Sequence, residues 1–534
     1  MSNPKTEVYL MPIGGAGDNV TGSSEILSCH VHGKTYYIAV DSGISQGKYE
    51  ERNERYPLNG ENLSAIVITH AHMDHMGGLA MLKNFKGKIY GTKETLLLGY
   101  EIIYDSVYQH IKKAAEAIGM SIENYFNTIK KLEDMKKRNS NPEEQKDLQD
   151  IILDIEQSAL YNYDDVERIR KCFCFVEPLQ RFIIANGIYG RLVPNSHQLG
   201  AVSVEIYVGE LYDPESVNIS FSGDIGPKDS MLYKKLIYEP NEFIQYAWME
   251  STHGIEERKQ STHEAYVELK DRVFDAIKRD GTLIIGTFAL DRSAKILYML
   301  NKMIDELNIC IPIYWDTPLG YTELRYYQNF YKNGSGYWFG NLGRNPFDDN
   351  ELIMCKTKAE HDEALSATGS KIIITASAFG EGGRINDYFN RYIEDENADF
   401  LFASWLSPDC TSNVLLTAER FNEKPIEIHG ELYYKKCQAH QIMGLTSHGY
   451  YPEFIDYIER FPNLKGIILN HGDRQAKNDL AKKISENYNF NIAIPELYDE
   501  AHAQNSFFKL NAQYIISISS REGYQIFESV MTNI

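Results

Sequence analysis

The chain has 534 residues, of which 43% are hydrophobic and 24% charged, a composition that is typical of a folded globular protein and excludes a disordered one. Its formal net charge of −21 argues against a protein that coats nucleic acid with surface lysines and arginines, so any nucleic-acid function must depend on metal ions and a few local cations. No apolar run approaches the ~18 residues that a membrane span needs.

The seven cysteines are scattered along the chain, which does not fit a disulfide framework and favours a reducing compartment. The opening stretch, "MSNPKTEVYLMPIGGAG", has no apolar segment of the kind found in a secretory signal and leads directly into a predicted strand. We therefore expect a cytoplasmic protein of two or more domains with no membrane partner.

Three kinds of pattern follow one another along the chain. Short β-rich runs separated by glycine turns fill residues 7–90, a spacing typical of a meander or sandwich. The pattern at about 95–170 is helical and densely charged, with a break at "RNSNPEE", and predicts a helical insertion. Between about 265 and 435, helices alternate with apolar strands, which indicates a parallel α/β sheet.

The stretch "IVITHAHMDHMGGLAML" places four polar side chains directly after a predicted buried strand: His70, His72, Asp74 and His75. Residues i and i+2 of an extended segment point the same way, so His70 and His72 can reach one metal ion. Asp74 and His75 follow the turn and can face a second ion. Zinc accepts imidazole nitrogen and carboxylate oxygen, usually four ligands in all, so each ion needs further ligands from elsewhere.

Later strand ends offer those further ligands. His197, Asp224 and His471 each lie at the end of a predicted strand, close to a glycine. Taken singly, each has an ordinary alternative, since a loop aspartate often caps a helix and a loop histidine often forms a simple hydrogen bond. Taken together, they complete the coordination of two ions.

In this order the motifs resemble those of the metallo-β-lactamase fold, and more closely those of its β-CASP branch of nucleases, which includes ribonuclease J and the endonuclease subunit of the eukaryotic pre-mRNA 3′-end cleavage complex. The likeness covers most of the chain. "AVDSG" resembles the branch's Asp motif with Asp41, and "MESTHG" its first β-CASP motif with Glu250. "GLTSHGYYPEF" resembles the second motif with His448, and "LNHGDRQA" the third with His471. A histidine at this last position accompanies the RNA-cleaving members.

The resemblance implies an α/β architecture, a metallo-β-lactamase αββα sandwich with an inserted β-CASP domain of mainly parallel sheet. It implies that the sandwich is split in sequence, with a first part at 1–252 that carries the helical insertion and a C-terminal part at 436–534. The β-CASP domain would occupy 253–435.

The resemblance also implies two zinc ions, with manganese as an open alternative. One ion would be held by His70, His72 and His197, the other by Asp74, His75 and His471, and Asp224 would bridge them. Two such ions acidify a water and clamp a scissile phosphate, which suits phosphodiester hydrolysis.

Three residues carry the implied catalytic roles: Asp74, His448 and Glu250. His448 would act as general acid or transition-state contact at the leaving oxygen, and Glu250 would orient it. Asp41 would brace the ligand loop without touching metal.

We also predict that Arg292, Arg384 and Ser447 bind the substrate; ordinary ion pairing at helix starts is the alternative for the two arginines. The departures from the branch's pattern include the turn "DCTSN" (Asp409 to Asn413) in place of a glycine-rich one and two single residues: His253 stands where tyrosine is common, and Tyr450 where aspartate is usual. These departures leave every expected ligand in place.

The leading interpretation is a zinc-dependent ribonuclease that hydrolyses single-stranded RNA during RNA processing or decay. The alternatives are a hydrolase of DNA or of a small ester or thioester on the same fold, and a non-catalytic scaffold of an RNA-cleavage complex. Whether the enzyme cuts internally or from the 5′ end, and whether the chain forms a homodimer, stays open.

Overall fold

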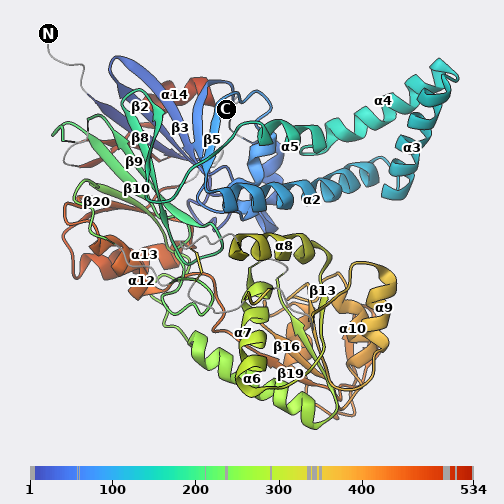
Figure 1. Cartoon of the computed structure of the whole chain (residues 1–534). Helices are drawn as coiled ribbons and strands as arrows, with labels where there is room; N and C mark the ends of the chain where they lie inside the picture. The colour runs from blue at the N-terminus through green and yellow to red at the C-terminus, as the bar shows by residue number, and fades with distance from the viewer. Residues whose placement is uncertain are drawn as a thin grey trace.

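The structure is a computed structural model with three parts: a two-sheet sandwich, a second α/β unit and a projecting helical arm (Figure 1). It describes residues 6–56, 58, 60–210, 212–234, 239–288, 291–332, 338–339, 345–347, 352–496, 506–511 and 514–531.

The first sheet of the sandwich has eight strands in the order β23-β22-β1-β2-β3-β4-β5-β6. Its antiparallel part contains β1 and β2, and the parallel part runs from β3 to β6. The strands are β1 (Glu7–Pro12), β2 (Glu25–Val31), β3 (Lys34–Val40), β4 (Leu63–Val67), β5 (Lys88–Gly91), β6 (Phe173–Phe175), β22 (Phe507–Leu510) and β23 (Ile515–Ile518).

The second sheet has seven strands in the order β21-β20-β11-β10-β9-β8-β7. Its parallel pair β11–β20 joins parts of the chain that are far apart in sequence, with Trp248 opposite Ile468. The strands are β7 (Arg181–Ala185), β8 (Ile188–Pro194), β9 (Val202–Val208), β10 (Val217–Phe221), β11 (Tyr246–Glu250), β20 (Gly466–Asn470) and β21 (Asn491–Ala493).

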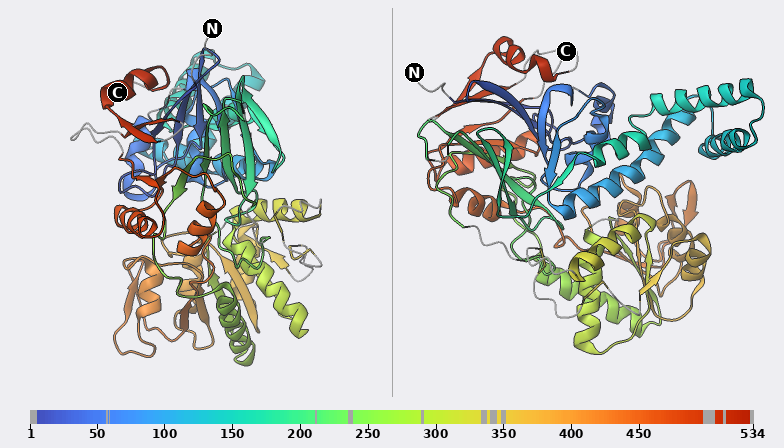
Figure 2. Two further views of the ribbon diagram at one scale, coloured as in Figure 1. Left: turned by 90° about the vertical axis from the view of Figure 1, so that its left-hand side faces the viewer. Right: turned by 45° about the horizontal axis from the view of Figure 1, so that its top comes forward.

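Helices cover the outer faces of both sheets, and Figure 2 shows the two sheets facing each other between them. Tyr457 and Leu480 are buried against the second sheet together with Ala247 and Leu469. This is the predicted αββα sandwich. The covering helices are α1 (Met73–Met76), α12 (Tyr451–Glu459), α13 (Arg474–Ser485) and α14 (Ser520–Phe527), and the 3-10 turns are η1 (Gly47–Arg55), η2 (Gly60–Asn62), η3 (Gly77–Met81) and η4 (Glu528–Val530).

The inserted unit is built on a six-stranded sheet in the order β14-β13-β15-β12-β16-β19, and all its pairs are parallel, as predicted. Central strands such as "TLIIG" are buried throughout, because helices cover both faces. The strands are β12 (Thr282–Gly286), β13 (Ile313–Asp316), β14 (Leu352–Met354), β15 (Lys371–Thr375), β16 (Asp399–Phe402) and β19 (Gln438–Gln441), with a separate hairpin of β17 (Ile426–Ile428) and β18 (Glu431–Tyr433). The helices are α6 (Thr262–Lys278), α7 (Arg292–Leu307), α8 (Pro318–Lys332), α9 (Lys358–Ser366), α10 (Ile385–Tyr392) and α11 (Thr411–Thr417).

Strand β19 ends this sheet at Gln441, beyond residue 435 where the sequence predicts the inserted domain to end. The predicted boundaries themselves stay predictions. The chain leaves the carboxyl end of β19 and enters the loop that carries His448. The carboxyl edge of the parallel sheet therefore adjoins the sandwich.

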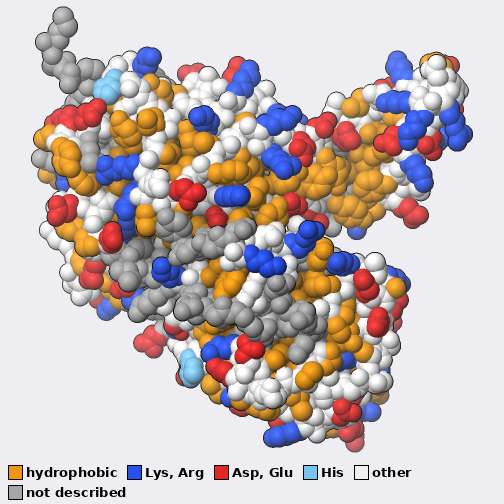
Figure 3. All heavy atoms as spheres, viewed as in Figure 1, with side chains coloured by type: hydrophobic (Ala, Val, Ile, Leu, Met, Phe, Trp, Pro, Cys, Tyr) orange, Lys and Arg blue, Asp and Glu red, His pale blue; other side chains and the backbone are white. Residues whose placement is uncertain are grey.

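Four helices form the arm where the sequence predicts a helical insertion. They are α2 (Lys93–Ala117), α3 (Ile122–Arg138), α4 (Pro142–Ser158) and α5 (Tyr163–Arg170). Lys and Arg side chains gather at its tip (Figure 3). The base of the arm is tied to the inserted unit, because the Tyr326 hydroxyl of α8 donates to Glu101 Oε1 of α2 at 2.8 Å. Among the described residues no helix is both long enough and apolar enough to cross a membrane.

Candidate metal centre

The predicted ligands come from strand ends that meet at one edge of the sandwich. His70 and His72 follow β4, and α1 then carries the next two ligands. Asp224 follows β10 and His471 follows β20, while His197 lies in the loop before β9. Strands β10, β11 and β20 run parallel in one sheet and end at the same edge, and β4 of the other sheet ends beside them, so that residues far apart in sequence such as His70 and His471 meet here.

One donor set has the spacing that a tetrahedral zinc site requires. His72 Nδ1 lies 3.1 Å from His70 Nε2 and 3.2 Å from His197 Nε2. Asp224 Oδ2 lies 3.5 Å from the same nitrogen of His70 and 3.6 Å from that of His197. Donors bonded to zinc at ~2.0–2.1 Å in a tetrahedron are separated by ~3.3–3.4 Å. These four atoms can therefore share one ion.

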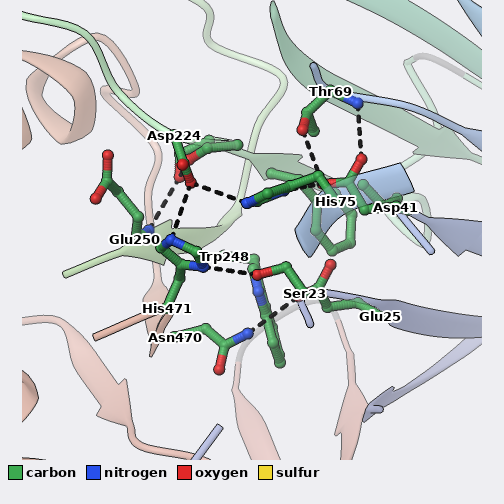
Figure 4. A pocket seen from close by; sticks show the side chains of 14 residues that line it. Ser23, Glu25, Asp41, Thr69, His75, Asp224, Trp248, Glu250, Asn470 and His471 are labelled. Carbon is green, nitrogen blue, oxygen red and sulfur yellow. Dashed lines mark hydrogen bonds and ion pairs between the residues drawn. The ribbon is translucent and has the colours of Figure 1, made fainter. Parts of the chain in front are cut away.

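A second donor set lies on the other side of Asp224: Asp74, His75 and His471. Figure 4 shows His75 and His471 directed at Asp224. Asp224 Oδ1 is 3.3 Å from His75 Nε2 and 3.5 Å from His471 Nε2. Both Asp224 Oδ1 and His75 Nε2 are buried without a hydrogen-bond partner among the described residues. Buried polar atoms are rarely left unpaired, and a cation between them would satisfy both. The residues present thus fit two metal ions joined by Asp224.

Asp41 fixes the ring of His75 from behind. Its Oδ2 accepts from His75 Nδ1 at 2.7 Å, and Thr69 donates to the same carboxylate through its backbone N–H and its hydroxyl, both at 2.7 Å. A proton held on Nδ1 leaves Nε2, which lies 3.3 Å from Asp224 Oδ1, as the atom of the ring that can bind a metal ion. These contacts agree with a bracing role for Asp41, which stays a prediction.

The other ligand rings are held in the same way. His197 Nδ1 donates to the carbonyl oxygen of Ser447 at 2.8 Å, and His471 Nδ1 lies 2.8 Å from Ser23 Oγ. Burial lowers the pKa of both His70 and His197 well below the ordinary value of an imidazole. The two rings are therefore neutral, which is the form that binds metal.

The carboxylate between the donor sets is kept ionised by its neighbours. Burial favours the neutral acid, but the electrostatic effect of the surrounding histidines, His471 and His75 first, outweighs burial and holds the pKa of Asp224 well below its usual range. An ionised Asp224 can offer one oxygen to each ion.

His448 and Glu250 form a pair at the open side of the centre. His448 Nδ1 lies 3.3 Å from Glu250 Oε2 and 3.8 Å from Asp224 Oδ2. Burial disfavours the imidazolium, but the carboxylates of Glu250 and Asp224 outweigh it and raise the pKa of His448 to about 9. The ring therefore carries a proton at neutral pH, which suits a general acid.

The predicted substrate-binding residues have partners within the protein. The Arg384 guanidinium pairs with the buried carboxylate of Asp316, which is the ion-pairing alternative. The Ser447 hydroxyl donates to Asp291 Oδ2 at 2.8 Å and accepts from Lys295 Nζ at 2.9 Å. A substrate-binding role for these side chains stays a prediction, and their present contacts are structural.

Sequence reasoning missed two features of the site. Asp291 and Lys295, 2.7 Å apart and both buried, hold the loop of Ser447 and through its carbonyl the ring of His197. No pattern signals this contact, because the two helix residues lie more than 150 positions from Ser447. The second feature joins the two single-residue departures from the branch's pattern: the rings of His253 and Tyr450 stack at 4.2 Å and 4°.

Three family descriptions match the chain in the order that the fold requires. Residues 31–97 match the Metallo-beta-lactamase superfamily, 294–409 the Beta-Casp domain, and 434–495 the Zn-dependent metallo-hydrolase RNA specificity domain. The chain therefore carries matches to the metallo-β-lactamase, Beta-Casp and RNA specificity domains that together make up the β-CASP branch of the metallo-β-lactamase superfamily. It is accordingly an enzyme, a metal-dependent hydrolase, and the predicted family is confirmed.

Several characterised β-CASP proteins align with most of the chain. Ribonuclease TTHA0252 of Thermus thermophilus is 24% identical over 493 residues, 88% of this chain and 95% of that protein. The transcription termination factor FttA of Cenarchaeum symbiosum is 22% identical over 93% of this chain and 71% of its own length. Integrator complex subunit 11 of Danio rerio is 21% identical over 92% of this chain and 73% of its own length.

Proposed function

We propose that this β-CASP enzyme is a ribonuclease that hydrolyses phosphodiester bonds in single-stranded RNA with two zinc ions. The observation that carries the proposal is the pair of donor sets joined by Asp224 and completed by His471. The alignment with ribonuclease TTHA0252 along 95% of that protein's length supports RNA as the substrate. The net charge of −21 is compatible with it because the charge needed at the phosphate comes from bound metal.

The side chains of the metal centre have separate roles in the proposed reaction. When bound, the two ions supply positive charge that acidifies a water and neutralises the scissile phosphate. Asp224 holds the two sets of donors at a fixed separation. Asp74 completes the second set with a half-buried carboxylate that lies 4.0 Å from His75 Nε2 and is in place to accept a proton from the attacking water.

His448 serves the leaving oxygen. Its imidazolium donates a proton there as the P–O bond breaks, and Glu250 keeps the ring protonated and oriented before the step. This division assigns proton uptake and proton delivery to opposite sides of the scissile phosphate.

The test compares single-stranded RNA and DNA of one sequence with zinc-loaded protein, a His72→Ala variant and a His30→Ala control. His72 shares the first donor set, whereas His30 lies on β2 beside Thr35. We expect RNA cleavage by the wild type and the control, loss of at least a hundred-fold in His72→Ala, and fewer than two zinc ions per chain in that variant by metal analysis.

Other outcomes decide against the proposal in different ways. Cleavage of both strands at equal rates would identify a general phosphodiesterase. Two bound zinc ions with neither strand cut would show that the metal centre is correct and the substrate is wrong, and would direct attention to small esters.

A further inference from the structure

We propose that the carboxyl edge of the parallel sheet carries a base-stacking subsite for unpaired RNA, formed by Phe288, Phe379 and Trp405 with Arg292 beside them. The inference rests on the proposed ribonuclease function and adds the surface that grips the strand next to the metal centre.

Chain connections and hydrogen bonds link this edge to the Ser447 loop, which holds one of the metal-site histidines. Phe288 precedes Asp291 by three residues, a reach of at most ~11 Å of extended chain. Asp291 accepts from Ser447, whose carbonyl in turn holds the metal-site ring of His197. Neighbouring strand β16 is tied to the same region, since Ala403, the residue after it, accepts from Arg292 Nη1 at 3.1 Å.

Trp405 lies on the same edge and faces solvent. It is two residues beyond Ala403, and the intervening Ser404 carbonyl accepts from Gln441 Nε2 at 2.8 Å. Gln441 ends β19, from which the chain reaches His448 seven residues later. The Trp405 side chain is 59% exposed, whereas the other three tryptophans of the chain are buried.

Phe288 and Phe379 supply a second aromatic surface. Their rings meet edge to face at 5.6 Å and 83°, and Phe288 is 39% exposed. The edge-to-face contact fixes the two rings at right angles to each other. Phe288 and Trp405 are thus exposed at the carboxyl ends of neighbouring strands, where a gathered aromatic surface can contact a ligand.

Arg292 adds charge to this surface. Its guanidinium carbon lies 5.1 Å from the centre of the Phe288 ring, and its Nε has no hydrogen-bond partner among the described residues. Burial lowers the pKa of Arg292 to about 10, so the side chain is still a cation at neutral pH. A cation beside an aromatic platform fits a phosphate next to a stacked base.

This chemistry fits the acidic composition of the chain. Stacking on an aromatic ring needs no positive surface, and it accepts every base because each has a flat face. It also requires an unpaired base, since the faces of paired bases are covered by their neighbours in a duplex. The subsite would therefore select single-stranded RNA by stacking.

The fluorescence of Trp405 reports whether RNA binds at this subsite. Single-stranded oligouridylate is mixed with wild-type protein in a stopped-flow fluorimeter, and tryptophan emission is followed before turnover. We expect quenching that a duplex of the same length does not produce and that Trp405→Phe abolishes. Steady-state KM for the oligomer should rise about five-fold to a hundred-fold in Trp405→Ala, stay near wild type in Trp405→Phe, and leave kcat unchanged.

Two controls separate the subsite from the chemistry. Phe421 is equally exposed, at 59%, but lies beyond α11, and Phe421→Ala should change nothing. Hydrolysis of bis(p-nitrophenyl) phosphate, which reaches only the metal centre, should be equal in all variants.

RNA cleavage with unchanged quenching and KM in the Trp405 variants overturns the subsite and leaves the ribonuclease assignment intact. Quenching that depends on Trp405, in a protein that cuts no RNA, overturns the ribonuclease assignment and supports the subsite as an RNA contact.

Discussion

His448 owes its proton to the carboxylate beside it. Removing that charge while keeping a hydrogen-bond acceptor, as in Glu250→Gln, leaves burial as the main influence on the ring, and burial lowers an imidazole pKa. The general acid must be protonated to act, so activity is lost as pH rises through the pKa of His448. We expect the alkaline limb of the pH–kcat profile to move about 1–3 units toward lower pH in Glu250→Gln.

The profile is measured between pH 6 and 10 with metal content checked at each end. His448→Ala is the reference, with an expected loss of about 10²–10⁴-fold in kcat and no alkaline limb of this origin. An unmoved limb in Glu250→Gln would remove His448 as the acid.

Helix α1, which carries two ligands, lies very close to the backbone of the loop after β3 at Gly43. A Cβ on Gly43 would lie 1.8 Å from the carbonyl oxygen of Asp74, and backbone cannot yield as a side chain can. Gly43→Ala should therefore push α1 away from Asp41, lower the second-site metal content and destabilise the protein by about 1–3 kcal/mol.

Metal analysis and thermal unfolding of the loaded protein measure this effect. Gly382→Ala is the matched control, because nothing lies within 4 Å of the Cβ it would add. Equal metal content in the two variants would contradict the role of the close approach.

A buried ion pair at the start of α7, Asp291 with Lys295, connects the inserted unit to the Ser447 loop through hydrogen bonds to the Ser447 hydroxyl. Removing one partner leaves the other charge buried and unpaired, which costs about 3–5 kcal/mol of folding free energy. Lys295→Met should therefore lower the unfolding midpoint strongly. It should also reduce activity, because the Ser447 carbonyl would no longer hold the ring of His197 in place. The double variant Asp291→Asn/Lys295→Met removes both charges, and we expect it to be more stable than Lys295→Met alone. A double variant less stable than the single one would show that the two residues act independently.

The parts of this molecule that could be predicted from sequence are those with a local signature. Four metal-binding side chains follow an apolar strand within six residues: His70, His72, Asp74 and His75. Such a pattern can be recognised without knowledge of the fold. The parallel sheet was similarly visible in its alternation of helix and strand. Contacts between distant residues carry no such signature. Arg384 pairs with Asp316, 68 positions away. The sequence could not predict this pair, because an arginine at the start of a helix has the same local sequence whether it contacts a phosphate or a carboxylate.

The pairing of β11 with β20 also determines when, during synthesis of the chain, the second donor set can form. Asp74 and His75 leave the ribosome early, but His471 follows β20 and is made almost 400 residues later. At typical synthesis rates of about 5–20 residues per second, roughly 20–80 s separate the first and last of these ligands. A partly translated chain therefore lacks the second donor set. On this arrangement, the full set of metal donors comes together only after β20 and His471 have been made.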